Sequence, residues 1–523
     1  MKKGYNKVTF RPYTMEQPSL LPPSLEELIP EDHLVRVVNR VMDELDLEPI
    51  LNEYKGGGTS SYHPRMMLKV LVYAYTQKVN SSRQIAKGLR ENVNFMWISG
   101  NNRPDFRTIN RFRSSVMKEG IEVVFSEVLH YLIEEGYVTL ENYFLDGTKI
   151  EANANKYKWV WAKSTAKYKE RLQEKIQELL RNIEQENEAE QEDYGDKDLE
   201  EVGGGNKQGG DGIDSEALQK RIERLNERLA GKMKDKRTAK AMRTLQEDYL
   251  PRQKKYEEQE KLLVGRNSYA KTDHDATFMR MKEDAMHNGQ LKPGYNVQIG
   301  TENQFVVGFS IHQKTNDINC LIPHLNQMKE RLGQLPRSVV ADAGYGSEEN
   351  YAYLERSGIE RYVKYPLFSK QQKRSWRKQR FQVEHWEYDP VQDEYICPNQ
   401  QRLTLLGTRY RNTDNGYRTS IREYECGACA TCPLKPECTR AVGNRRLWIN
   451  PTLNRYQQQA CAKLVSDQGR RLRSRRGVEV ETVFGRIKQD WGFRRFTLRG
   501  MEKVKTEWGL LCIAHNIAKL AVQ

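Results

Sequence analysis

The sequence contains no run of about 18 apolar residues, the shortest stretch that predicts a membrane-spanning helix. It begins with Met1-Lys-Lys-Gly and continues into polar residues, without the apolar core of a secretory signal peptide. We therefore expect no membrane partner and a cytoplasmic location.

Acidic residues are also in deficit. The chain has 71 Asp and Glu against 85 Lys and Arg, a formal charge of +14 and a pI near 9.1. This balance favours a polyanion as partner, and nucleic acid is the leading candidate because basic residues release its counterions. Many soluble proteins are mildly basic, so charge alone does not decide. At 523 residues the chain exceeds the size at which a single core stops growing, which predicts a catalytic core with accessory modules.

Only eight cysteines occur, but five of them cluster. Overlapping CxxC turns present thiolates at the spacing of metal ligands, and in a cytosolic chain such a cluster favours structural zinc over disulfides. A tetrahedral site needs four thiols, so which four bind stays open, as does the alternative of reduced, unliganded cysteines. No partner base is evident nearby, so nucleophilic catalysis by these thiols is not expected. The predicted zinc ligands are Cys397, Cys426, Cys429, Cys432 and Cys438.

Residues 1–137 are predicted to be mainly helical, because apolar residues recur at helical spacing. Within them, one short helix is expected to begin with Ser82 as its N-cap and a second to begin at Asp105. Two such helices suit a helix-turn-helix, with Arg107 and Arg111 as DNA contacts. The alternative is a helical domain whose arginines are simply solvated.

The catalytic core is predicted to be interrupted by insertions. Residues 138–155 and 264–365 together contain three strands, a helix, a strand, a second helix and a final strand, in that order. That order predicts an α/β fold: a ribonuclease H-like mixed-sheet core with helices. The segments are strands at Tyr143–Ile150, Tyr295–Gly300, Phe305–His312, Ser338–Asp342 and Glu360–Tyr365, and helices at Leu321–Leu332 and Glu348–Arg356.

Residues 156–263 are charged and predict a coiled-coil hairpin insertion. Two apolar series, each spaced like a coiled-coil seam, flank an acidic and then glycine-rich loop over 184–212. We read this insertion as a spacer without chemistry, with contact to DNA or a second protomer as the alternative. The series are Leu172, Ile176, Leu179 and Ile183, then Leu218, Ile222, Leu225 and Leu229.

Residues 366–458 hold the cysteine cluster and predict a small β-rich insertion. From 459 to 523 the chain returns to long helices that should complete the core. The last of these carries the apolar stripe Val504, Trp508, Leu511 and Ile517.

Two aspartates at the predicted sheet edge are candidate metal ligands. Asp146 lies in the first strand and Asp342 ends the fourth, and we expect these strands to lie side by side. Their carboxylates would then converge at one edge of the sheet and hold two Mg²⁺ (or Mn²⁺) ions for phosphodiester cleavage. The alternatives are that Asp146-Gly147 forms a turn and that Asp342 merely ends a strand.

A third carboxylate is expected from the closing helix, where Glu479 and Glu481 are the candidates. We favour Glu481 because Phe484 and Lys488 share its helical face, so that Phe484 packs and Lys488 approaches phosphate. Glu479 would pair with Arg486 instead, and an ordinary solvated helix is the bland alternative. The basic residues expected to contact DNA here are Arg476, Arg486, Lys488, Arg494 and Arg495.

These blocks together resemble insertion-sequence transposases of the DDE superfamily. The similarity rests on Leu145-Asp-Gly-Thr-Lys-Ile-Glu-Ala-Asn-Ala-Asn-Lys, Gly294-Tyr-Asn-Val-Gln, Val340-Ala-Asp-Ala-Gly-Tyr-Gly-Ser, Glu481-Thr-Val-Phe-Gly-Arg-Ile-Lys with the following Gly-Phe-Arg-Arg-Phe-Thr-Leu-Arg-Gly, and Ala514-His-Asn-Ile-Ala-Lys-Leu. It implies a bacterial enzyme with Asp146, Asp342 and Glu481 as Mg²⁺ ligands. Such an enzyme hydrolyses the element's ends and joins them to target DNA as a homodimer.

The sequence departs from the family around the third acid. Many relatives carry Tyr, two residues, Arg, three residues, Glu, six residues, Lys. Here Glu481 and Lys488 fit, but Ser474 and Gly477 occupy the Tyr and Arg positions, and Arg476 is one residue off. This keeps Glu479 as an alternative ligand. The competing functions are a nuclease with the same core that joins no ends, a catalytically inactive DNA-binding derivative, and, lowest in rank, a zinc-stabilised coiled-coil scaffold.

Overall fold

A computed structural model describes residues 23–52, 54, 61–193, 213–229, 236–281, 289–413 and 415–522. The described residues group into two compact units. One contains the chain up to Val124 together with the residues from Ile513 onward, and the other contains Phe125–Cys512. Each unit is described separately below.

The first unit is helical, which confirms the prediction of a helical N-terminal region. Asp105 caps its helix as expected, accepting a hydrogen bond from the backbone N–H of Thr108 at 2.7 Å. Ser82 does not act as an N-cap, because the helix starts one residue earlier than expected, with Ser81 in the capping position. The helices are α1 (Leu34–Glu44), α2 (Glu48–Leu51), α3 (Pro64–Thr76), α4 (Ser82–Glu91), α5 (Val93–Ile98), α6 (Phe106–Arg111) and α7 (Met117–Glu134), the last of which continues into the second unit.

The two short helices of the predicted helix-turn-helix are α4 and α6, and they pack against each other. They are not consecutive, because α5 lies between them in the chain. Arg107 and Arg111 of α6 are both exposed.

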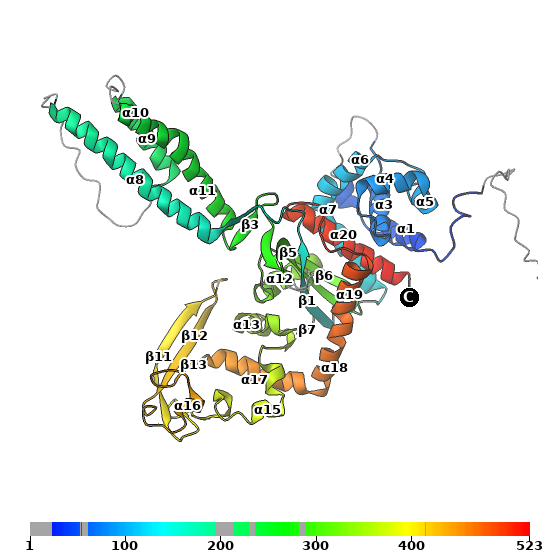
Figure 1. Ribbon diagram of the computed structural model, residues 1–523. Coiled ribbons are helices and arrows are strands. Elements are labelled where there is room, and N and C mark those ends of the chain that lie inside the picture. Colours follow the sequence, from blue (N-terminus) through cyan, green and yellow to red (C-terminus); the bar gives the residue numbers. More distant parts are fainter. Residues whose placement is uncertain are drawn as a thin grey trace, which may run out of the picture. The chain divides into compact units, whose positions relative to one another are not determined.

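A mixed six-stranded sheet forms the centre of the second unit (Figure 1). Its order is β4-β5-β1-β7-β8, with β6 paired to β5; β1 runs antiparallel to β5 and parallel to β7, and β7 is parallel to β8. The predicted mixed sheet and the pairing of the first and fourth predicted strands are therefore confirmed. The strands are β1 (Asn142–Glu151), β4 (Thr277–Arg280), β5 (Leu291–Glu302), β6 (Phe305–His312), β7 (Ser338–Ala341) and β8 (Glu360–Val363).

The two helices predicted for this core are present, and two of its strands pack closely. The predicted helices are present as α12 (Leu321–Leu332) and α13 (Glu348–Arg356). Tyr143 of β1 is fully buried, and a Cβ at Gly300 of β5 would lie 1.7 Å from its ring, so only glycine lets the two strands pack there.

Within the described residues, the first insertion contains four α-helices where we predicted two, and a π-helical turn over Leu245–Tyr249 joins the last two of them (Figure 1). The two expected helices are present, but the first runs on through 184–193, which we had predicted as loop; the rest of that loop lies outside the described residues. Leu180 enters the core in place of Leu179, which packs beside it. The helices are α8 (Ala162–Asp193), α9 (Ser215–Leu229), α10 (Lys236–Thr244) and α11 (Leu250–Leu263).

A short two-stranded sheet stands where this insertion leaves the core and returns to it. It pairs β2 (Trp159–Trp161) with β3 (Ser268–Ala270). The two ends of the insertion are therefore adjacent, which lets the central sheet form across more than a hundred intervening residues.

The second insertion contains a five-stranded antiparallel sheet in the order β13-β12-β11-β10-β9. The β-rich character predicted for 366–458 is observed. Its elements are α14 (Phe368–Gln371), α15 (Arg374–Arg377), β9 (Glu387–Asp389), β10 (Glu394–Ile396), β11 (Arg402–Asn412), β12 (Arg418–Cys426), α16 (Lys435–Cys438) and β13 (Arg446–Ile449).

Helices complete the chain, as predicted. All four residues of the expected apolar stripe are buried. Within the described ranges, no helix combines the length and the apolar character needed to cross a bilayer. The helices are α17 (Pro451–Val465), α18 (Asp467–Arg476), α19 (Thr482–Gly485) and α20 (Met501–Leu520), with π-helical turns over Gly477–Glu481 and Arg486–Asp490.

Candidate active site

Strand pairing brings the two predicted aspartates together. Leu145 of β1 pairs with Ala341 of β7 in a parallel register, so Asp146, still within β1, and Asp342, directly after β7, lie at the same level. Asp146 is held by the N–H of Gly147 at 2.9 Å and Asp342 by the N–H of Gly344 at 2.8 Å. The two carboxylates are thus fixed at one edge of the sheet by their own backbones.

Gly147 is not part of a turn, which removes the alternative reading of Asp146-Gly147. It lies within β1 and pairs with Gln298 of β5. A Cβ at this position would lie 2.2 Å from Gln298 Nε2 and 2.8 Å from Asp317 Oδ1. Glycine is needed there because two polar side chains approach the strand directly beside Asp146.

One arginine lies among the three predicted acids. A terminal nitrogen of Arg476 is 2.9 Å from Asp146 Oδ2 and 3.9 Å from Asp342 Oδ2, and the other is 4.0 Å from Glu481 Oε1. The Arg476 side chain is only 11% exposed, and its Nε is buried without a hydrogen-bond partner among the described residues. A cation therefore already sits at the point where the three carboxylates converge.

A π-helical turn explains how Arg476 reaches this point. The turn covers Gly477–Glu481, and its wider winding places residues five apart on one face. Arg476 and Glu481 are five residues apart, so they face the same site although Arg476 is one position away from the family spacing. Gly477, which occupies the family's Arg position, leaves Glu481 free: a Cβ there would be in ordinary contact, 3.9 Å from the carboxylate.

Glu479 has a different environment. It is 3% exposed, accepts the backbone N–H of Gln304 at 2.6 Å, and pairs with Arg475 at 2.8 Å. Gln304 belongs to the tight turn between β5 and β6, where its φ is 62°. Glu479 therefore fastens this turn to the closing helix, and the cation beside it is Arg475. Glu481, in contrast, is 70% exposed.

The electrostatics of Asp146 are those of a partly buried acid among other acids. Burial raises its pKa to about 6; Arg476 lowers the pKa, and the carboxylates of Asp342 and Asp317 raise it further. A positive charge at this site thus stabilises the ionised form of Asp146.

Asp317 is a site residue that sequence reasoning missed. It starts a short 3-10 turn, Asp317–Asn319, and accepts hydrogen bonds from Asn296 Nδ2 at 2.8 Å and Gln298 Nε2 at 3.0 Å. Asn296 and Gln298 are fully buried and alternate along β5, which places them on one face of the sheet. Two buried polar residues at strand spacing were the signal that could have located this pocket.

Lys364 was also missed. It directly follows β8, and its backbone N–H donates to Ala341 O, one residue before Asp342. Burial lowers the pKa of Lys364, and so do Arg476 and Arg473, whereas Asp342 and Glu481 act in the opposite direction. A second cation therefore lies on the β8 side of the acids.

The other basic residues of the second unit that were predicted to contact DNA differ in their exposure and packing. Lys488, which was predicted to share a helical face with Glu481, is 7% exposed, whereas Glu481 is 70% exposed. A second π-helical turn, Arg486–Asp490, breaks the regular helical period on which that prediction rested. Arg486 packs over the ring of Trp491, whereas Arg494 and Arg495 are exposed beside the end of β1.

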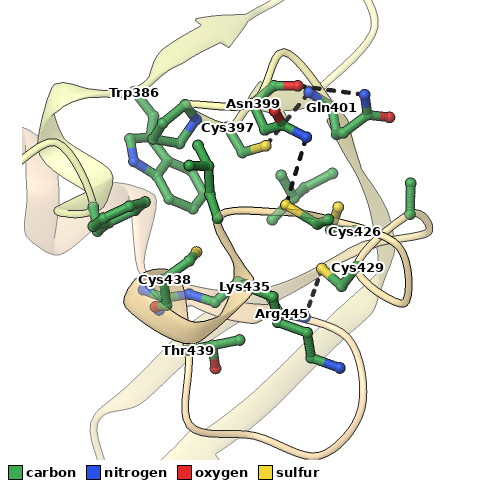
Figure 2. Close-up of a pocket in the computed structure, with 16 residues that line it drawn as sticks. Trp386, Cys397, Asn399, Gln401, Cys426, Cys429, Lys435, Cys438, Thr439 and Arg445 are labelled. Carbon is green, nitrogen blue, oxygen red and sulfur yellow. Dashed lines mark hydrogen bonds between the residues drawn. The ribbon is translucent and has the colours of Figure 1, made fainter.

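The five clustered cysteines line one pocket beside Trp386 and Arg445 (Figure 2). Three of the sulfurs accept hydrogen bonds: Cys397 from the N–H of Gln401 at 3.4 Å, Cys429 from that of Arg445 at 3.3 Å, and Cys432 from Asn399 Nδ2 at 3.5 Å. Burial raises the pKa of Cys426 to about 11. All eight cysteines are free thiols.

As placed, no three His, Cys, Asp or Glu side chains within the described ranges form a group that could hold a metal ion. At the three acids, the chemistry of the donors still fits a hard cation, since carboxylate oxygens are the ligands that Mg²⁺ prefers. The guanidinium of Arg476 stands in for such a cation.

The chain matches three protein-family models. Residues 23–115 match a model described as "Transposase domain (DUF772)", and residues 266–388 and 396–521 each match a model described as "Transposase DDE domain". No curated protein and no solved structure matches the chain. The two DDE matches together include Asp342 and Glu481, and the third covers most of the first helical unit.

Proposed function

Because this chain belongs to the DDE transposases of insertion sequences, we propose that it cuts DNA at the ends of its element and joins those ends to target DNA. Asp146, Asp342 and Glu481 would be the catalytic carboxylates. The observation that carries this proposal is the meeting of these three side chains around one cation, 2.9 to 4.0 Å from their oxygens. The strand order of the central sheet supports a ribonuclease H-like core.

The carboxylates would hold two Mg²⁺ (or Mn²⁺) ions. When bound, such ions activate the attacking oxygen and neutralise the charge on the leaving one. Asp146 and Asp342 provide rigid ligands because each is fixed by a neighbouring backbone N–H. Glu481, which is largely exposed, closes the site from the helix side. Lys364 is positioned to neutralise a phosphate that enters beside Asp342.

DNA would be bound through exposed basic residues of both units. In the second unit these are Arg494 and Arg495, which lie at the end of the strand that carries Asp146. In the first unit they are Arg107 and Arg111 of α6. Lys488 is omitted from this proposed interface because its burial favours a packing role. Since an element has two ends, we propose that two protomers act together on DNA.

Zinc would stabilise the second insertion. The support is the five free thiols that line one pocket and the N–H groups directed at three of the sulfurs, an arrangement that suits thiolate ligands. Zinc binding would need the thiols to lose their protons and their side chains to adjust, since as placed no three of the described ones form a ligand group. Which four of the five bind is left to the experiment.

The test is cleavage of a DNA duplex that carries the sequence flanking the gene, in Mg²⁺ and in EDTA. We expect Asp146→Asn, Asp342→Asn and Glu481→Gln each to reduce cleavage by ~10³-fold or more while DNA binding persists. Glu479→Gln is the matched control, because it removes the same charge two residues away and should retain cleavage at a temperature where it is folded.

Three other results would change the assignment. Loss of cleavage with Glu479→Gln but not with Glu481→Gln would make Glu479 the third ligand. Cleavage without any joined product would favour a nuclease with this core. DNA binding without cleavage by the wild type in Mg²⁺ would favour a catalytically inactive, DNA-binding descendant of a transposase.

A further inference from the structure

Arg476 and the three carboxylates form one cluster of charges. Three acids at one point repel one another, and Arg476 lies 2.9 Å from Asp146 and within 4.0 Å of the other two. Its side chain is 11% exposed, so its interaction with the carboxylates is screened less than that of a surface pair.

The same place must receive the metal ions. Ions bound by these oxygens and a guanidinium 2.9 Å from Asp146 Oδ2 would compete for the same negative charge.

We infer that Arg476 is an exchangeable counter-ion: it positions the three carboxylates before metal loading and must leave them when metal ions bind. This inference rests on the proposed function, because it takes Asp146, Asp342 and Glu481 as the metal ligands. Arg476 is therefore a positioning residue whose presence lowers the affinity of the free protein for divalent cations.

The environment of Arg476 supports its release. Its Nε is buried without a hydrogen-bond partner among the described residues, so the side chain is held mainly by the charges of the acids. The turn that carries it is π-helical, with a winding that is rare and occurs frequently at functional sites. Lys364 and Arg473 place further positive charge nearby. Once bound metal ions neutralise the acids, this charge repels the Arg476 side chain and favours its departure.

Arg475 provides a matched control within the same helix. It is the preceding residue and carries the same charge, but it pairs with Glu479 at 2.8 Å and is 45% exposed. Its removal changes the net charge of the protein by the same amount without touching the three acids.

The test is Mn²⁺ binding to the full-length protein without DNA, measured from the electron paramagnetic resonance signal of free Mn²⁺. We expect Arg476→Gln to bind Mn²⁺ at least ~10-fold more tightly than the wild type, within the usual range for coupled sites. Arg476→Lys, which keeps the charge, should stay close to the wild type, and so should Arg475→Gln. Equal or weaker Mn²⁺ binding by Arg476→Gln would overturn the inference.

A second measurement covers the possibility that Arg476→Gln folds poorly. Its melting temperature should lie below that of the wild type in EDTA, because the acids lose their counter-ion, and the gap should close in Mn²⁺. A gap of the same size in both buffers would identify Arg476 as merely structural. If Asp146→Asn and Glu481→Gln leave Mn²⁺ binding unchanged, the proposed metal site itself is wrong. If these two substitutions weaken Mn²⁺ binding but Arg476→Gln does not strengthen it, only the exchange of Arg476 for metal is wrong.

Discussion

Glu479→Gln should destabilise the protein far more than Glu481→Gln, although both substitutions replace one glutamate of the same π-helical turn. The Glu479 carboxylate is 3% exposed and accepts two hydrogen bonds, from the N–H of Gln304 at 2.6 Å and from Arg475 at 2.8 Å. A glutamine can keep only one of these bonds with its oxygen and must turn its NH₂ group toward the other donor.

The magnitude follows from these contacts. A buried hydrogen bond to a charged acceptor contributes about 1.5–3 kcal/mol. The pair with Arg475 adds less than about 1 kcal/mol, because the Arg475 side chain is 45% exposed. We therefore expect Glu479→Gln to lower the free energy of unfolding by about 2–3 kcal/mol. Glu481→Gln should change it by less than about 0.5 kcal/mol, because Glu481 is 70% exposed and its nearest cation lies 4.0 Å away.

Urea unfolding followed by tryptophan fluorescence, in EDTA so that no metal contributes, measures both changes. The same proteins assayed for DNA cleavage should show the opposite order: Glu481→Gln inactive and Glu479→Gln active while folded. Equal urea midpoints for Glu479→Gln and the wild type would refute the role of Glu479 in fastening the β5–β6 turn. A larger loss of stability in Glu481→Gln would refute the assignment of both residues.

Three further predictions concern the rest of the second unit. Gly300→Ala places a Cβ 1.7 Å from the ring of buried Tyr143 and should lower the free energy of unfolding in urea by about 1–3 kcal/mol. Gly407→Ala is the control, because a Cβ there meets nothing within 4 Å, and an equal loss of stability in both variants would contradict the packing argument. Burial lowers the pKa of His312 to about 4 and that of His324 well below its usual value, so both stay neutral in the folded protein while the unfolded chain takes up protons near pH 6.5. Stability should therefore be complete above about pH 6.5 and fall as the pH drops toward 4, by up to about 1.4 kcal/mol per pH unit for each histidine; a urea midpoint that is constant between pH 7.5 and 5 would contradict this. If the clustered cysteines hold zinc, the purified protein should contain about one zinc per chain, and a strong chelator should release it and lower the melting temperature; a zinc-free protein with an unchanged melting curve would argue for unliganded thiols.

The strand period made the two aspartates predictable. Apolar residues before Asp146 and Asp342 identify buried strands, and the order of elements identifies which strands pair in parallel. These features depend on local patterning, so the sequence was enough to predict that the two carboxylates meet at one edge of the sheet. The zinc site predicted from the cysteine spacing stays a prediction, although the five thiols line one pocket.

Helical spacing was a weaker guide around the third acid. The prediction that Lys488 shares a helical face with Glu481 assumed a regular period of 3.6 residues, and two π-helical turns break that period. Arg476 was displaced by one residue from the family pattern, and only the wider turn explains why it still faces Glu481. The helical insertion was predicted with two helices, but Met242 of α10 and Leu245 of the π-helical turn after it also enter its core.

By itself, the sequence determined the helical first unit, the mixed sheet and the two aspartates that it brings together, because each depends on a periodicity that neighbouring residues impose. Only the tertiary structure decided the roles of Glu479, Asp317, Lys364 and Arg476. Each acts through partners distant in the chain or through an irregular turn: Glu479 through Gln304, 175 residues away, and Asp317, in a 3-10 turn, through Asn296 of β5. Burial and charge at such points arise when the strands and helices pack, and no local pattern in the sequence records them.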